Sequence, residues 1–309
     1  MLLHTTLCNL LRIEVPIIQA GMSRLTSASL TTAVSYAGGL GSLGGLQRSP
    51  DEKAKELSKI RELTDKPFAV NYVVPDINEE SFQLTLEAKP AIISFALGDP
   101  RAHVKRAHDV GSLVMHQVTT VQQARQAAER GVDIIIAQGS EAGGIGGPVA
   151  ALPLIPQVVD AVGPIPVVAA GGIVNGCGLA ATLLLGAIGV NLGTRFLATL
   201  EAPIEDDWKK AIVDGSSEGS VKIAGWVPAK ITDEYQASLR VLRTDFIDRW
   251  NQQSNDGLEE AALRDEGKLV PVARESAGLI KDILPAADIV QTIAAETEQV
   301  LKNAGQFLK

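Results

Sequence analysis

The sequence predicts an α/β protein: a (β/α)8 TIM barrel followed by a smaller helical substrate domain. Two observations favour the barrel: eight short apolar segments recur in the first 200 residues, and helical patterns separate them. The segments lack the alternation of half-exposed strands, which is typical of parallel strands buried on both faces. Eight such units are the number that a closed barrel requires. A doubly wound open sheet is the competing fold.

Each expected strand is a short apolar run, and a helical pattern follows it. The expected strands are Pro16–Gln19, Leu40–Leu43, Phe68–Asn71, Ala91–Ser94, Leu113–Gln117, Ile134–Ala137, Pro166–Ala170 and Gly189–Gly193. The expected helices are Ser27–Ala37, Pro50–Leu63, Glu79–Ala88, Pro100–Asp109, Thr120–Arg130, Leu152–Val162 and Gly176–Leu185. Start signals support two of these helices, because Ser49 precedes Pro50 and Asp99 precedes Pro100.

The pattern changes after Phe196, which divides the chain into residues 1–200, 201–284 and 285–309. The middle part is richer in charge and shows helical periodicity without clear strands, so we expect a small helical domain there. Its helices are expected at Asp207–Asp214, Asp233–Gln252 and Asp256–Arg264. The last part is an amphipathic helix that we expect to pack back on the barrel, with an apolar face of Ile289, Ile293, Val300 and Leu301.

Composition narrows the class of ligand. A formal charge of −8 and a pI near 5.1 argue against a nucleic-acid or membrane-surface partner, because the sequence shows no concentrated basic patch. Cys8 and Cys177 are too few for a disulfide framework or a zinc site. No apolar run approaches the ~20 residues of a membrane span. We therefore expect a cytoplasmic protein with a small-molecule ligand.

Glycine turns follow several of the expected strands. Gly171 and Gly172 end one strand, and Gly193 and Thr194 end the next. Glycine lets the backbone approach a ligand closely, and N–H groups at such turns bind anions. A barrel commonly has its phosphate site at the last two strand ends. The turns therefore predict a phosphate-binding site.

Amide side chains stand at three other strand ends. Asn71, Gln117 and Gln138 can each donate and accept hydrogen bonds, which suits the edge of a heterocycle such as a flavin. Together with the phosphate turns, they favour flavin mononucleotide (FMN) as the cofactor. No histidine pairs with a carboxylate at a strand end, so no metal site is expected.

Longer motifs give the chain a family resemblance. They are PIIQAGM at residues 16–22, AGGLGSLGG at 37–45, PFAVN at 67–71, AQGSEAGG at 137–144, AAGGI at 169–173 and GTRFLAT at 193–199. Over nearly its whole length the chain resembles the nitronate monooxygenase family, formerly called 2-nitropropane dioxygenases, and the related flavin-dependent enoyl-ACP reductases. The resemblance implies an FMN-containing barrel with a helical substrate domain.

The resemblance also implies which residues contact the cofactor. They are Ala20, Gly21, Met22, Asn71, Gln138, Gly143, Gly172, Asn191, Leu192, Gly193 and Thr194, with Gly171 as a neighbour in the phosphate turn. Gln117 stands where many relatives have a lysine near the flavin. Ser140 and Ile145 would line the substrate pocket.

One position departs from the family pattern. Many relatives read GSEAGGH, in which the histidine deprotonates a nitroalkane or positions the substrate, whereas this chain has Ile145 there. Isoleucine cannot accept a proton, so the change is either a divergence to another substrate or an engineered one. His116 is a candidate substitute base, although a hydrogen-bonded wall residue is the plainer interpretation.

Four functions are compatible with these features. The first is FMN-dependent oxidation of alkyl nitronates with dioxygen, which needs no base because a nitronate is already deprotonated. The second is an NAD(P)H-dependent flavin reductase of enoyl thioesters or quinones. The third is a flavin-binding protein without turnover, and the fourth is a flavin-free isomerase of a phosphorylated substrate. The expected partners are a small-molecule substrate and dioxygen, with NAD(P)H and a second copy of the chain as further candidates.

Overall fold

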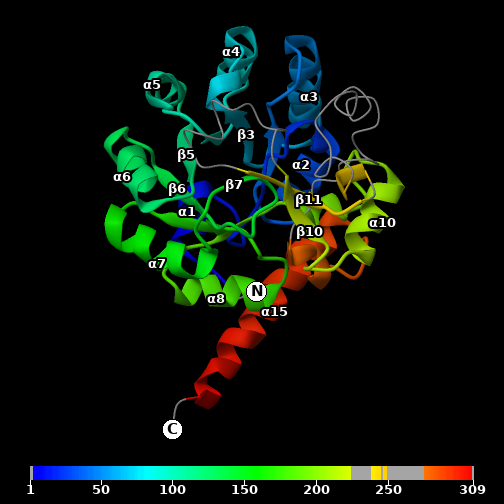
Figure 1. Cartoon of the computed structure of the whole chain (residues 1–309). Helices are drawn as coiled ribbons and strands as arrows, with labels where there is room; N and C mark the ends of the chain where they lie inside the picture. Colours follow the sequence, from blue (N-terminus) through cyan, green and yellow to red (C-terminus); the bar gives the residue numbers. More distant parts are fainter. Residues whose placement is uncertain (1–2, 224–237, 245, 249–274, 308–309) are drawn as a thin grey trace.

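The computed structural model describes residues 3–223, 238–244, 246–248 and 275–307. Eight parallel strands form its central sheet in the order β1-β9-β8-β6-β5-β4-β3-β2, with helices around them (Figure 1). The strands are β1 (Ile17–Gln19), β2 (Gly41–Gly44), β3 (Phe68–Val73), β4 (Ile92–Ala96), β5 (Leu113–Val118), β6 (Ile134–Gln138), β8 (Val167–Ala170) and β9 (Val190–Leu192). All eight expected strands are present, which confirms the barrel and excludes the open doubly wound sheet.

Contacts between the two edge strands close the barrel. Ile18 forms an isolated parallel bridge with Leu40, just before β2. The buried Gln19 side chain accepts a hydrogen bond from the Ser42 N–H (2.9 Å) and donates one to the Ser42 carbonyl (3.1 Å). Main-chain pairing between β1 and the segment that leads into β2 is limited to one isolated bridge, and the Gln19 side chain adds two hydrogen bonds beside it.

Seven helices follow the strands as expected, with bounds that differ by at most one residue at each end. They are α2 (Ala28–Tyr36), α3 (Pro50–Leu63), α4 (Glu79–Ala88), α5 (Arg101–Asp109), α6 (Val121–Glu129), α7 (Ala151–Val162) and α8 (Gly176–Leu184). Capping explains why α3 starts where it does: Ser49 accepts from the Glu52 N–H (3.2 Å), and Glu52 accepts from the Ser49 N–H (2.9 Å).

Two hydrophobic clusters form the core of the barrel, and a third, around Trp208 and Ile212, joins α10 to the segments that follow the barrel. A cluster of lumen residues fills the barrel, and it includes Leu7, Cys8 and Leu11 of helix α1 (Thr6–Leu11), so α1 covers the amino-terminal end of the strands. A larger cluster lies between the strands and the surrounding helices. This division tells which way each strand residue points, since successive side chains alternate between the two faces.

The part after the barrel contains strands that the periodicity did not indicate. Helix α10 (Asp206–Asp214) is present as expected, but β10 (Ser220–Ile223) and β11 (Ser238–Leu242) form an antiparallel sheet. The expectation of no strands was therefore wrong, as was a helix through residues 238–242. The expected helix at 256–264 lies outside the described residues.

The new sheet includes a strand from the barrel's own loop. Strand β7 (Gly144–Gly146), between β6 and α7, pairs antiparallel with β11, so the sheet order is β10-β11-β7. Pairing places Ile145 opposite Leu239, and Leu239 opposite Ile223. The loop after β6 is thereby held by the segment that follows the barrel.

Helix α15 (Ala286–Asn303) packs against α8 and α2 of the barrel and then extends away from it toward the C-terminus (Figure 1). Its first half buries Ile289 and Ile293, whereas Val300 and Leu301 are half-buried. The Gly176 N–H at the start of α8 donates to Glu296 (2.9 Å), which fixes α15 against α8.

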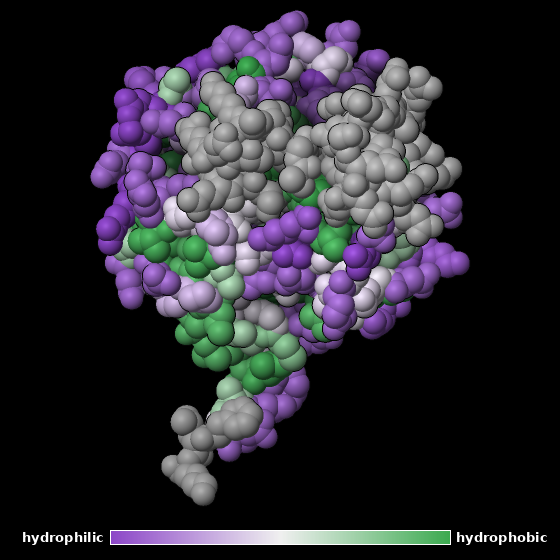
Figure 2. Space-filling view, viewed as in Figure 1, coloured by the Kyte–Doolittle hydropathy of each residue, from purple (hydrophilic) through white to green (hydrophobic). Residues whose placement is uncertain are grey.

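The surface is mostly hydrophilic, but apolar residues gather on the visible face over α7 and α8 (Figure 2). Leu152 on α7 is 69% exposed and Leu184 on α8 is 73% exposed. No helix in the described part of the chain combines the length and apolar character needed to cross a membrane.

Candidate active site

Amide side chains meet in the lumen at the carboxyl ends of the strands. In β5, Leu113 and Met115 pack with the lumen cluster, whereas Val114 packs with the helices. Alternation therefore turns Gln117 toward the lumen. The same argument, applied to β3, β6 and β9, places three further amides on this face: Asn71, Gln138 and Asn191.

Two of these amides are held in place by hydrogen bonds. The buried Gln138 donates from Nε2 to the Ile145 carbonyl (2.9 Å), so it supports β7 above the barrel. Asn71 donates from Nδ2 to Ser94 Oγ (3.4 Å) and to the Ser94 carbonyl (3.5 Å). Gln117 is half-buried and also lines a pocket at the rim. The amides are thus oriented before a ligand binds.

The predicted phosphate turns lie next to each other, because Ala170 pairs with Asn191. Gly171 (φ 101°) and Gly172 (φ 73°) have left-handed backbones that favour glycine. A Cβ on Gly171 would lie 3.1 Å from both the N and the O of Gly139, so a side chain there would require the Gly139 backbone to shift. Gly193 precedes the short helix α9 (Thr194–Leu197), and Thr194 is buried. This arrangement fits a phosphate group.

The turn after β1 completes the ring of candidate contacts. The Ala20 N–H donates to the Leu192 carbonyl (2.8 Å), which joins the two strand ends. A Cβ on Gly21 would lie 2.3 Å from the Asn71 Cβ, so only glycine allows this close approach. Met22 is half-buried beside it. The Leu192 side chain packs among the helices, so only its main chain reaches the site.

The loop after β6 has a rigid base. Glu141 accepts from the Ala151 N–H with both oxygens (3.0 Å each) and so caps α7. The Ser140 N–H donates to the Val149 carbonyl (2.8 Å), and Ser140 itself is half-buried. Gly143 is buried within the same loop, ahead of the half-buried Ile145. The loop therefore presents Ile145 on a fixed strand.

His116 does not share the lumen with the amides. It neighbours Gln117 in β5 and therefore points to the opposite face, toward α5 and α6. Burial lowers the pKa of His116 to about 4, and the more distant Asp99 offsets this only in part. From the outer face of β5, the His116 imidazole does not reach a flavin ring bound in the lumen. The geometry therefore disfavours His116 as a substitute catalytic base.

Two residues near the site did not attract attention in the sequence. Ser94 is buried and faces the lumen, which the alternation in IISFA would have indicated. Lys53 of α3 is fully buried, with its Nζ 4.3 Å from the centre of the Tyr72 ring. Its Nζ would also lie 2.7 Å from a Cβ on Gly45, next to the end of β2. Its spacing from Leu57 and Ile60, the buried apolar residues of α3, is the signal that could have found it, because residues four and seven apart share a helix face.

The strand residues that face the lumen near the strand ends, all within the described ranges, include no ionisable side chain: they are Ala20, Ser42, Gly44, Asn71, Ser94, Ala96, Gln117, Gln138, Ala170 and Asn191. Nearby, Arg240 of β11 is engaged elsewhere, because it pairs with Glu275 (3.0 Å) and donates to Ser220 Oγ (3.0 Å). Within the described ranges, no group of three His, Cys, Asp or Glu residues is arranged to hold a metal. The site therefore offers hydrogen bonds and apolar contacts rather than charge.

Comparison with known proteins identifies the family of the chain. The profile of the nitronate monooxygenase family matches residues 4–83 and 77–299. The chain is 37% identical to a (3aS,4S,5R,7aS)-5-hydroxy-7a-methyl-1-oxo-octahydro-1H-indene-4-carboxyl-CoA dehydrogenase of Mycobacterium tuberculosis, over 87% of this chain and 74% of that protein. It is 32% identical to a probable nitronate monooxygenase of Staphylococcus saprophyticus, over 83% of each chain.

Solved structures resemble it over almost the entire chain. FabK from Thermotoga maritima superimposes with a TM-score of 0.90 at 32% identity, covering 99% of this chain and 100% of FabK. A nitroalkane oxidase from Streptomyces ansochromogenes gives a TM-score of 0.83 at 27% identity, covering 97% and 100%. These matches support the predicted fold and the family resemblance. The chain therefore belongs to the nitronate monooxygenase family, a family of flavin-dependent oxidoreductases.

Proposed function

We propose that this protein is an FMN-dependent oxidoreductase that acts on the uncharged acyl end of a thioester, with NADH or NADPH as its second substrate. The observation that carries the proposal is the uncharged lumen face beneath Ile145. A small anion bound there would lose its hydration without gaining a positive partner, which is costly. A neutral, largely apolar substrate avoids this cost.

The apolar character continues above the barrel. Ile145, Leu239 and Ile223 lie side by side across β7, β11 and β10, and the latter two are buried. Directly opposed residues of antiparallel strands present their side chains on one face of the sheet. Isoleucine at residue 145 is thus part of an apolar row, which suits an acyl chain and excludes water.

The chain's residues would hold the cofactor by hydrogen bonds. Backbone N–H groups at Gly171, Gly172 and Gly193 would bind the phosphate, and the lumen amides of Asn71 and Gln138 would orient the ring edge. Bound FMN would supply the hydride chemistry that no side chain can provide. The name of the Mycobacterium tuberculosis relative includes a carboxyl-CoA group, which supports a thioester as substrate.

Oxidation of alkyl nitronates with dioxygen is the second candidate. A nitronate arrives deprotonated, so Ile145 in place of a base is no obstacle to it. A neutral nitroalkane would first have to lose a proton, and the described residues of the lumen face include no group to accept it. This candidate predicts turnover of nitronates with little use of nitroalkanes. The similarity to probable nitronate monooxygenases supports it.

An anaerobic titration of the purified protein separates the two. Bound flavin is followed by its absorbance while NADH, NADPH or an alkyl nitronate is added, and mass spectrometry of the released cofactor tests for FMN. Bleaching by a nicotinamide, reversed by an enoyl thioester, is expected. Bleaching by the nitronate alone would overturn the proposal in favour of the second candidate, and a colourless protein would overturn both.

A further inference from the structure

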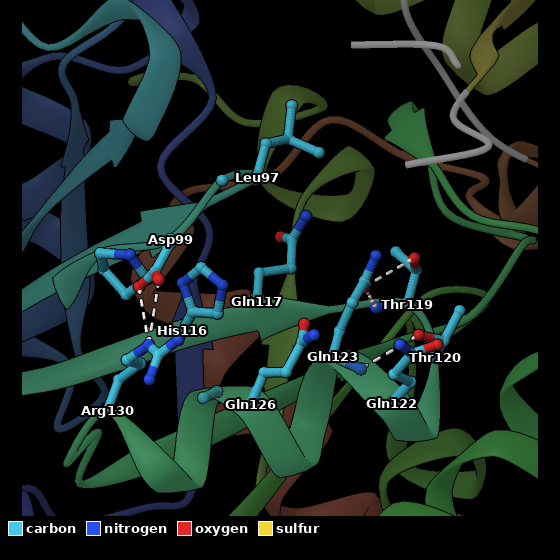
Figure 3. A pocket seen from close by; sticks show the side chains of 13 residues that line it. Leu97, Asp99, His116, Gln117, Thr119, Thr120, Gln122, Gln123, Gln126 and Arg130 are labelled. Atoms are coloured by element: carbon cyan, nitrogen blue, oxygen red, sulfur yellow. Dashed lines mark hydrogen bonds and ion pairs between the residues drawn. The ribbon is translucent and has the colours of Figure 1, made fainter. Parts of the chain in front are cut away.

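A polar groove of about 640 Å³ opens at the rim of the barrel, beside Gln117. Its floor is the end of β5, one wall is the turn at residues 97–100, and the other wall is helix α6 (Figure 3). Thr120 and Arg130 mark the two ends of the α6 wall, which is ~15 Å long at 1.5 Å per residue. Because Gln117 lines the groove and also faces the lumen, the groove leads outward from the candidate flavin site.

The groove is rich in hydrogen-bonding groups but nearly balanced in charge. The Arg130 Nε pairs with Asp99 Oδ2 (2.9 Å), which offsets the two charges. Between this pair and Thr120, the α6 wall presents the amides of Gln122, Gln123 and Gln126 (Figure 3). Such a surface suits a ligand that is uncharged along most of its length and carries amide groups of its own.

Several groups in the groove have unused hydrogen-bonding capacity. Gln123 Oε1 accepts from the Thr119 N–H (2.8 Å) and Oγ1 (3.1 Å), which orients the amide and leaves its NH2 group to donate. His116 is only 6% exposed, and its Nδ1 has no partner in the described part of the chain. Buried polar atoms rarely lack a partner, so this nitrogen points to a ligand or an ordered water.

The outer end of the groove suits an anion. Arg130 donates to both Asp99 oxygens through Nε alone, and its terminal guanidinium nitrogens have no hydrogen-bond partner within the described ranges. Asp99 also pairs with a second cation, because the Arg101 guanidinium lies 3.4 Å from Asp99 Oδ2. Arginine is well suited to phosphate because its N–H groups bind two oxygens at once.

We propose that this groove binds a phosphopantetheine arm, with its phosphate at Arg130, its amides along Gln123 and Gln126, and its thioester end at Gln117. This inference rests on the proposed thioester substrate. The arm carries amides, hydroxyl and a terminal phosphate in a single extended chain, in the order that the groove presents their partners. The same arm occurs in coenzyme A and on acyl carrier proteins.

Titration calorimetry on the flavin-loaded protein tests the groove, with coenzyme A and free phosphopantetheine as probes. Arg130→Gln should weaken both probes about tenfold or more, because it removes a charged hydrogen bond to phosphate. Gln126→Leu should weaken them several-fold, and Gln126 is exposed, so the fold tolerates the change. Arg125→Gln, an exposed change elsewhere on α6, is the matched control and should leave affinity unchanged.

The two sources of the arm give different results. Tighter binding of coenzyme A than of phosphopantetheine supports coenzyme A as the carrier, and equal binding supports a carrier protein. If neither probe binds, the proposal that the groove binds the arm is wrong. Equal losses of probe affinity in Arg130→Gln and Arg125→Gln would also contradict it. Probe binding without thioester turnover supports the groove and overturns the proposed function. Thioester turnover whose KM is the same in wild type and Arg130→Gln supports the proposed function and overturns the groove.

Discussion

The amine of Lys53 is the least expected group in the core. Burial, with a smaller contribution from Arg48, lowers the pKa of Lys53 from 10.5 to about 7. Its ammonium form is therefore costly in the folded protein, although the Tyr72 ring faces it. Since the unfolded chain holds the proton up to its ordinary pKa, Lys53 lowers stability most below pH 7, and this penalty disappears as the pH rises toward 10.5.

Lys53→Met should consequently raise the free energy of unfolding at pH 7 by a few kcal/mol. The difference from wild type should shrink by up to about 1.4 kcal/mol per pH unit between pH 7 and 10.5. Urea unfolding at several pH values measures it, and Lys55→Met, exposed on the same helix, is the control. A gain that did not vary with pH would show that packing, not charge, limits this position.

His116 gives a prediction of the same sign in a lower pH range. Burial lowers the pKa of His116 to about 4 from 6.5, so the unfolded chain binds the proton first as the pH falls between these values. Wild type should lose up to about 3 kcal/mol relative to His116→Gln over this range. The variant should also keep its kcat, since the histidine lies outside the lumen. A large fall in kcat with KM unchanged would restore His116 as a catalytic base.

At the scale of elements, the turn after β8 offers a direct test of cofactor binding. Gly171→Ala should weaken FMN about tenfold or more, because the added methyl forces the turn away from Gly139 and displaces the phosphate donors. Gly131→Ala is a matched control: its φ is 78°, and no atom lies within 4 Å of the added Cβ. That control should cost about 1 kcal/mol of stability without changing FMN affinity. Fluorescence titration of the apoprotein measures both.

Most of the elements were predictable because each βα unit carries its own apolar run, and two of the helices also carry a start signal. The added sheet was not, because β7 has only three residues, two of them glycine, and exists through its pairing with β11. Strand β11 contains SLRVL, a sequence that also fits a helix, so its neighbours decided its conformation. At the site, the glycines and amides could be predicted from the sequence because they stand at the ends of the expected strands. The outward direction of the His116 side chain could not be predicted, because it depends on which residues of β5 face the lumen.

The stability of the whole molecule depends on how its last described long helix, α15, packs on the barrel. Ile293 of α15 is 3% exposed in the main core, so Ile293→Ala should cost roughly 2–5 kcal/mol. Val300→Ala, on the half-buried part of the same helix, should cost much less. Thermal unfolding of both variants compares them. Equal losses would mean that the distal half of α15 packs as tightly as the proximal half.

The pairing of β1 with β9 also sets an order of events during synthesis. Strand β1 emerges from the ribosome early, but its partner lies more than 150 residues later, so its edge stays open until β9 is made. The same pairing brings the turn at residues 20–22 beside Gly193. A shorter nascent chain contains the turn at residues 20–22 but lacks Gly193, so the two halves of this site cannot meet. Cofactor capture must therefore wait for ring closure, and a ribosome stalled before residue 190 would display a chain unable to retain flavin.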